Sequence, residues 1–410
     1  MPRLSKTDNM TLKKLGPGLL FAGAAIGVSH LVQSTRAGAD FGFGLIWALL
    51  LVNLFKYPFF QFGPRYAAAT NESLLDGYKK LGKGVLIVYL ALTLLTMFTI
   101  QAAVTIVTAG LAKSLFGLEL SIEIWTVIVL VVCTSILLFG SYKLLDRFIK
   151  VIIVTLAIST LIAVLMAVFN NTEPVSFKQI FPVTSNEIIF LIAFMGWMPA
   201  PLDISIWHSL WANEKQKTNL NIEPKDALFD FNIGYLGTVI LGIGFISLGA
   251  LIMFNSGETF SNQAGAFAAQ LINMYTTSLG QWAYIIIGIA AFTTMFSTTI
   301  TTLDASPRAM NRTLELLFSK QLKNGYKTWL FILSIGTILI FFFLASEMVL
   351  LVKIATILSF ITAPFYAIAN YRLISSKHTP KEWRPSKLLH VLSWLGILFL
   401  ISFSIWYLSI

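Results

Sequence analysis

Long apolar runs, separated by short polar or basic segments, follow one another along almost the whole chain. Runs of 18 or more apolar residues have the length that a helix needs to cross a bilayer, and they lack the strict alternation typical of membrane β-strands. The pattern therefore predicts an all-α polytopic membrane protein with eleven transmembrane helices. The predicted spans cover residues 17–40, 44–68, 84–112, 122–141, 148–169, 187–212, 228–254, 281–304, 328–345, 347–371 and 388–409.

The composition agrees with this pattern. Hydrophobic residues make up 56% of the 410 residues and charged residues only 12%, whereas soluble domains carry about a quarter charged residues. The net charge of +10 comes from Lys and Arg between the apolar runs, which indicates cytoplasmic loops and not a nucleic-acid-binding surface. The single cysteine, Cys133, lies inside an apolar run, so neither a disulfide framework nor a cysteine-based metal site is expected.

The distribution of Lys and Arg predicts the orientation. With the N-terminus in the cytoplasm, 24 of the 29 basic residues fall in inside segments and only Lys113 and Lys178 fall outside. Such a bias predicts a multi-pass protein of a bacterial-type plasma membrane, with the C-terminus outside. We expect residues 1–16 to form a cytoplasmic tail and residues 17–410 to form one transmembrane domain.

No catalytic constellation is evident. The four His and one Cys form no Ser–His–Asp grouping and no His-Glu-x-x-His motif, and a nucleotide-binding loop is also missing. We therefore expect a protein that is not an enzyme and carries no resident cofactor. Its expected partners are the lipid bilayer and a small inorganic or carboxylate ion, without nucleic acid, and we expect a monomer.

Two spans contain residues that interrupt a helix. The middle of the first span reads Gly27-Val28-Ser29-His30, and the sixth span reads Pro199-Ala200-Pro201-Leu202-Asp203. Broken backbone inside a membrane needs rescue by protein or by a polar cavity, and paired breaks in corresponding spans are typical of transporters built from inverted repeats. The two halves would be residues 17–169 and 187–371, followed by an extra helix at 388–409.

Several segments carry a family resemblance. They are Gly16-Pro17-Gly18, residues 24–47, residues 63–78, Ser297-Thr298-Thr299-Ile300-Thr301, and Met198-Pro199 or Ala200-Pro201. In these segments the chain resembles the Nramp divalent-metal transporters, which have the LeuT-type fold. The resemblance implies two inverted five-helix repeats plus one extra helix, and alternating access around a site between helices 1 and 6.

The chain departs from the Nramp pattern at the site itself. Residues Gly27 to His30 replace the family's Asp-Pro-Gly-Asn, so the metal-binding carboxylate is missing. In span 6, alignment on Pro201 puts Ala200 and Leu202 at ligand positions, whereas alignment on Pro199 keeps Met198, and the register stays open. The third span has no Asp or Glu, and Gln101 is among its few polar residues. These departures argue against proton-coupled uptake of manganese or iron.

One interpretation of the altered site is a small anion of bicarbonate type. Half-helix N-termini carry partial positive charge and free N–H groups, and Ser29 and His30 can donate hydrogen bonds. The substrate-site residues would then be Gly27 to His30 together with Pro199, Ala200, Pro201, Leu202 and Asp203. Sodium is the expected coupling ion, with Ser297, Thr298 and Thr301 as oxygen ligands.

The alternative is a divalent cation, Mg²⁺ or Mn²⁺, carried without proton coupling. Asp203 would replace the lost carboxylate, and His30 would supply a nitrogen ligand. Three further charges have structural interpretations: Asp304 and Arg308, four residues apart, predict an ion pair, and Lys56 is expected to snorkel or to pair. The sequence leaves both substrate interpretations open.

Overall fold

Helices form almost all of the chain that the structure describes. The computed structural model covers residues 17–139, 142–171, 174–218, 224–254, 256–343 and 347–409, and none of these residues lies in a β-strand. The predicted cytoplasmic tail, residues 1–16, lies outside the described residues. The all-α prediction is confirmed.

Eight of the described helices are long and apolar enough to cross a membrane. They are α4 (Ile46–Thr70), α6 (Lys83–Phe116), α7 (Ile122–Phe139), α11 (Pro224–Ile252), α13 (Ala283–Phe318), α14 (Gly325–Phe343), α15 (Met348–Ser375) and α16 (Lys387–Leu408). Each coincides with a predicted span, and Val154–Asn170 of α8 (Tyr142–Asn170) falls in another. The total of eleven spans stays a prediction.

The first and sixth predicted spans are each divided by a break. In the first, α2 (Pro17–Ala25) ends before a bend at Ile26 and Gly27, and the chain continues as a π-helix, η1 (Ser29–Ser34), and α3 (Thr35–Phe41). In the sixth, α9 (Ser185–Trp197) is separated from α10 (Ile204–Thr218) by six residues that contain Pro199 and Pro201. A proline removes a backbone donor and clashes with the preceding turn, which explains the second break.

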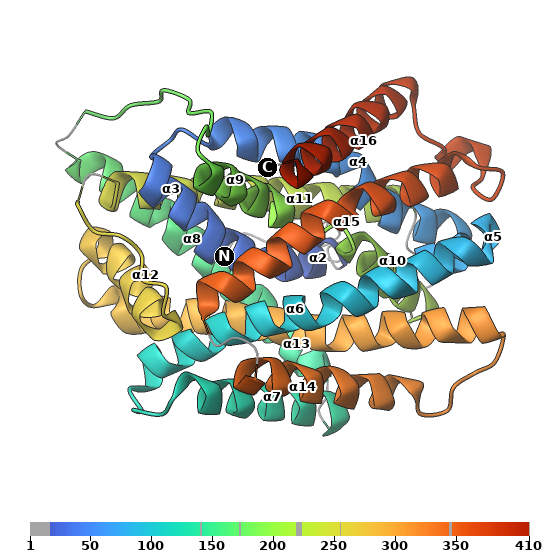
Figure 1. Ribbon diagram of the computed structural model, residues 1–410, viewed down its shortest axis with the longest axis horizontal. Coiled ribbons are helices and arrows are strands. Elements are labelled where there is room, and N and C mark those ends of the chain that lie inside the picture. Colours follow the sequence, from blue (N-terminus) through green and yellow to red (C-terminus); the bar gives the residue numbers. More distant parts are fainter. Residues whose placement is uncertain are drawn as a thin grey trace, which may run out of the picture.

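The broken helices lie in the middle of the molecule, as Figure 1 shows for α2 and α10. Glycines let them approach their neighbours closely. An added Cβ would stand 2.1 Å from the Asp230 carbonyl oxygen at Gly18 and 2.0 Å from that of Ile246 at Gly38. Both carbonyls belong to α11, so the first broken helix is held against α11 by backbone contact of the kind that small residues allow in membranes.

The second broken helix is held in the same way. A Cβ on Gly63 of α4 would stand 2.3 Å from the Ser205 carbonyl oxygen of α10, and one on Gly196 of α9 would stand 2.1 Å from that of Thr356 in α15. The two halves of the sixth span are therefore packed against different helices. These contacts hold the ends of both breaks in place. The candidate site lies between the two breaks.

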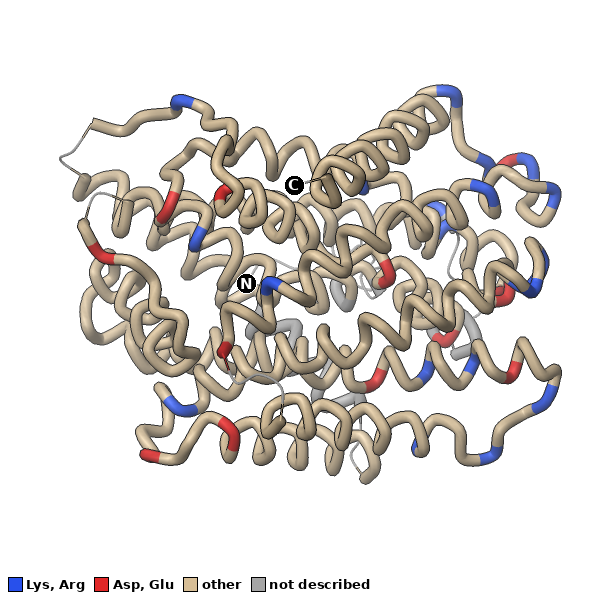
Figure 2. The backbone as a smooth tube through the Cα atoms, viewed as in Figure 1, with Lys and Arg blue, Asp and Glu red and all other residues tan. Residues whose placement is uncertain are grey.

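Positive charge gathers at one end of the molecule. Figure 2 shows most Lys and Arg positions where α5 (Leu74–Leu81), the connection after α13 and the connection before α16 lie. We call this the basic end. The opposite end carries α12 (Ala264–Leu279) and the segment 174–183 (Figure 1). This separation agrees with the predicted alternation of inside and outside loops.

The predicted orientation has a direct test. In a Cys133→Ala background, cysteines introduced at the exposed positions Lys178 and Lys320 should be labelled differently by a membrane-impermeant maleimide. We expect Lys178→Cys to react in intact cells and Lys320→Cys to react only after permeabilisation, because Lys320 belongs to the basic end. The opposite labelling pattern would show that the basic end faces outward.

Candidate functional site

The break in the first span lies against α13. A Cβ on Gly27 would stand only 2.8 Å from Thr298 Oγ1 and 3.0 Å from its methyl carbon. Only glycine therefore allows Thr298 to reach the bend without displacement. The structure brings the predicted substrate residue Gly27 and the predicted sodium ligand Thr298 into direct proximity. Ser297 is also buried, whereas Thr301 is partly exposed on the same helix.

His30 is held by protein partners on both sides of its ring. Its Nδ1 lies 2.7 Å from Ser29 Oγ, and its Nε2 lies 2.9 Å from the Thr238 carbonyl oxygen of α11. A carbonyl only accepts, so Nε2 carries a proton. Ser29 Oγ also lies 2.6 Å from the Ala25 carbonyl oxygen. His30 thus joins the break to α11, and neither ring nitrogen is free to bind a cation.

The break in the sixth span is occupied by Lys56 of α4. Its ammonium donates to the carbonyl oxygens of Met195 at 2.7 Å, Gly196 at 2.8 Å and Met198 at 3.2 Å, with Ala200 at 3.5 Å. The side chain is fully buried. The expectation that Lys56 snorkels is wrong, because its nitrogen lies inside the molecule and is bound by backbone carbonyls. In the described residues no carboxylate is hydrogen-bonded to it, and its charge interacts with that of Asp203 without direct contact.

Asp203 precedes α10 directly and is 6% exposed. Its Oδ1 has no hydrogen-bond partner in the described part of the chain. The carboxylate interacts electrostatically with Lys56 and with the hydroxyls of Tyr89 and Tyr366, which come from α6 and α15. Asp203 therefore offsets the charge of Lys56 across the break without a direct ion pair among the described residues.

A small cavity lies where the two breaks meet α6 and α13. Its volume is about 20 Å³, and a cavity needs about 10–15 Å³ to hold one water molecule, so it admits roughly one water-sized group. The residues that line it are Ala24, Ala25, Val28, Ser29, Ile100, Val104, Trp197, Pro201, Ile204, Trp207, Thr298 and Thr302. None of these side chains is a carboxylate, an imidazole, a thiol or a thioether.

The polar groups at the cavity are held by neighbouring helices. Trp197 Nε1 donates to Ser359 Oγ of α15 at 2.8 Å, and the Thr302 hydroxyl donates to Gln101 Oε1 of α6 at 2.7 Å. Gln101 thus joins α6 to α13 beside the cavity. The hydroxyls of Ser29, Thr298 and Thr302 and the indole N–H of Trp197 already donate to protein acceptors. A small polar substrate would therefore have to compete for these donors.

The structure brings together part of the predicted site. Val28, Ser29, Pro201 and Thr298 line one cavity. The remaining predicted substrate residues are buried around the breaks but outside the cavity lining: Gly27, His30, Pro199, Ala200, Leu202 and Asp203.

The sequence interpretation missed Lys56, Thr302, Ile100 and Val104. A lysine in the middle of an apolar span is costly and was the available signal for Lys56. The two aliphatic residues of α6 carry no such signal. The described residues also contain no group of three or more His, Cys, Asp and Glu side chains that could hold a metal ion.

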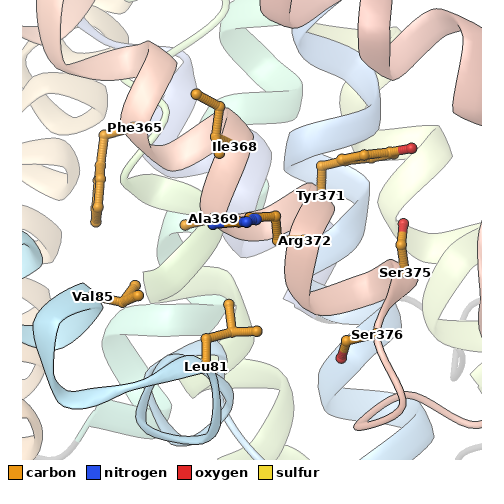
Figure 3. Close-up of a pocket in the computed structure, with 9 residues that line it drawn as sticks. All are labelled: Leu81, Val85, Phe365, Ile368, Ala369, Tyr371, Arg372, Ser375 and Ser376. Atoms are coloured by element: carbon orange, nitrogen blue, oxygen red, sulfur yellow. The ribbon is translucent and has the colours of Figure 1, made fainter.

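A larger hollow of about 660 Å³ lies at the basic end, between α5, the start of α6 and the end of α15 (Figure 3). Apolar side chains, among them Val85, Phe365 and Ile368, line it together with Arg372. It contains none of the predicted site residues. The cavity between the breaks is therefore the candidate functional site.

Comparisons with known proteins identify relatives along nearly the whole chain. The family model described as natural resistance-associated macrophage protein-like matches residues 18–409. An uncharacterized protein of Pasteurella multocida (strain Pm70) is 37% identical over 405 residues, which cover 96% of this chain and 92% of that protein. A protein of Oryza sativa subsp. japonica named metal transporter Nramp2 is 24% identical over 411 residues, 94% of this chain and 75% of the relative.

Solved structures show the fold. A crystal structure of the Eremococcus coleocola manganese transporter superposes with a TM-score of 0.71 at 12% identity, covering 98% of this chain and 87% of that chain. A crystal structure of MhsT in complex with L-phenylalanine superposes with a TM-score of 0.65 at 14% identity, covering 95% of this chain and 98% of that chain. The chain has the LeuT-type fold, as the resemblance implied.

The close contact at Gly27 generates a prediction. Gly27→Ala should lower the free energy of unfolding by about 1–3 kcal/mol, because the added methyl overlaps Thr298 and forces α2 away from α13. Thermal unfolding in detergent measures the effect. Gly237→Ala on α11 is the control, since nothing lies within 4 Å of a Cβ at that position. Equal midpoints for wild type and Gly27→Ala would show that the two helices are not held this closely.

Proposed function

This chain belongs to the natural resistance-associated macrophage protein-like (Nramp) family of transporters, and from that premise we propose that it carries a small anion of bicarbonate type into the cell together with sodium. The carrier would be secondary active and work by alternating access. The observation that supports the anion is the lining of the cavity between the breaks, which has hydroxyls and indoles but no metal-binding side chain. Because the cavity of about 20 Å³ admits only a water-sized group, binding of bicarbonate would require the breaks to move apart.

The charge next to the cavity also favours an anion. The ammonium of Lys56 is bonded to the carbonyls of Gly196 and Met198, which flank the cavity-lining Trp197. A buried positive charge repels a divalent cation and attracts an anion where the effective dielectric constant is low. Asp203, which offsets the charge of Lys56 across the break, reduces both effects. The partial positive charge at the start of α10 acts in the same direction.

Sodium would bind between the first break and α13. Thr298 lies against Gly27, and hydroxyl and carbonyl oxygens are the ligands that hard cations prefer. Ser297 and Thr301 belong to the same helix and complete the proposed ligand set. The site would then share the first break with the substrate, so that binding of one ion helps to order the break for the other.

The packing suggests which parts move. Glycine contacts join the first broken helix to α11 and α4 to α10, and Lys56 joins α4 to α9. The contacts of Gly27 with α13 and of Gly196 with α15 join the same helices to the rest, so the motion would have to change them. We propose that these helices, spans 1, 2, 6 and 7, rock as one bundle against the rest, in a monomer with its N-terminus inside and its C-terminus outside. In this proposal the transporter consists of two inverted repeats, residues 17–169 and 187–371, followed by an extra helix, residues 388–409.

A divalent cation is the second candidate, because the rice relative is named a metal transporter and the Eremococcus coleocola structure is that of a manganese transporter. In this chain its ligands would be Asp203 and His30. Both ring nitrogens of His30 already have protein partners, and forming the metal site would require breaking one of those bonds. The anion therefore remains the better-supported substrate.

Flux into proteoliposomes tests the proposed function. We expect the purified protein to take up radiolabelled bicarbonate saturably at alkaline pH, several-fold faster with an inward sodium gradient than without one. Mn²⁺ and Mg²⁺ should not enter above the rate of protein-free liposomes. Saturable metal uptake that is indifferent to sodium would overturn the anion proposal and support the metal alternative.

Two variants separate the alternatives further. Asp203→Asn should keep bicarbonate uptake within about threefold of wild type, a change below about 1 kcal/mol, because the carboxylate does not line the cavity. His30→Ala should raise the KM about tenfold, since it removes hydrogen bonds that hold Ser29 and the break in place. Complete loss of uptake in Asp203→Asn would instead identify Asp203 as a substrate ligand.

A further inference from the structure

The carboxyl end of α9 has carbonyl groups that the helix cannot satisfy. In a helix, the carbonyl of residue i accepts from the N–H of residue i + 4. For Met195 and Trp197 those residues are Pro199 and Pro201, which have no N–H. Carbonyl oxygens of Met195, Gly196, Met198 and Ala200 instead converge on one point, the Nζ atom of Lys56.

This arrangement has the chemistry of a monovalent-cation site. It consists of neutral carbonyl oxygens at 2.7–3.5 Å around a single positive charge, at the helix end that carries partial negative charge. Three N–H groups are available on an ammonium, and three of the carbonyls lie at 3.2 Å or less. The charge is fully buried, and such a charge is tolerated only when it is well bonded.

We propose that the break in the sixth span is a binding site for a monovalent cation of ammonium or potassium size, and that Lys56 fills it permanently with a cation attached to the chain. The wild-type carrier then needs no dissolved cation at this break. Because the ammonium is attached to α4, the site also holds α4 and α9 together. The proposal does not depend on the identity of the transported substrate.

Shortening the lysine should open the site to dissolved ions. In Lys56→Ala the carbonyls lose their cation, and the thermal midpoint of the purified protein should fall by several degrees in N-methylglucamine buffer. Ammonium or potassium should restore at least half of this loss, and the midpoint should rise with the logarithm of their concentration, as expected for binding to the folded state only. The wild-type midpoint should not respond to the choice of cation.

Three further variants serve as controls. Lys56→Met fills the space with an uncharged chain of similar length, so its midpoint should fall and ammonium and potassium should not restore it. Lys56→Arg keeps a charged donor and should stay insensitive to the cation. Lys353→Ala removes the other intramembrane lysine, which is exposed on α15, and should behave like wild type.

The outcomes are distinct. A midpoint of Lys56→Ala that is equal to that of wild type in N-methylglucamine, or a loss that neither ammonium nor potassium repairs, would overturn the proposal. If Lys56→Ala yields no folded protein in any salt, Lys56→Gln decides, because it keeps N–H donors without the charge. A wild-type midpoint for Lys56→Gln would contradict the need for a cation, and a clear loss would support it. These measurements involve no flux, so the result stands apart from the anion proposal.

Discussion

The structure depends on one constraint: a backbone group that leaves a helix inside a membrane must find another partner, because lipid offers none. Both breaks meet this constraint with protein groups. In the sixth span the carbonyls at the end of α9 are bonded by the Lys56 ammonium. In the first span, Ser29 bonds the Ala25 carbonyl oxygen, and the His30 ring ties the break to α11. The two breaks are therefore stabilised differently, and only the sixth-span break has a full charge, that of Lys56, beside the site.

This difference shapes what the site can bind. The cavity between the breaks is about 20 Å³ and has no carboxylate, imidazole or sulfur on its lining. The nearby charges, Lys56 and Asp203, are buried and offset each other across the sixth-span break. In this chain the cavity is lined by hydroxyls and indoles, and the Lys56 ammonium is bonded to carbonyls that flank the lining residue Trp197. We therefore propose a small anion, and not a divalent cation, as the ligand of this cavity.

Much of the fold could be predicted from sequence because its causes are local. Apolar length predicts spans, and Gly27, Pro199 and Pro201 predict breaks. The i, i + 4 spacing of Asp304 and Arg308 predicts their ion pair, which is confirmed at 2.6 Å. The arrangement of the site was harder to predict from the sequence. Lys56 approaches the break from a helix some 140 positions away in sequence, and the direction of the His30 ring is decided by a carbonyl of α11. Contacts between residues so far apart in the chain leave no periodic signal in the sequence.

The central claim, that the site between the breaks accepts an anion and not a metal, is tested most directly by equilibrium binding. Isothermal titration calorimetry of the detergent-purified protein with bicarbonate, in sodium buffer and in potassium buffer, and with Mn²⁺ in parallel, measures it without transport. The account predicts saturable bicarbonate binding that strengthens in sodium, and no specific heat from Mn²⁺. Stoichiometric Mn²⁺ binding that is lost in Asp203→Asn, with no binding of bicarbonate, would contradict it.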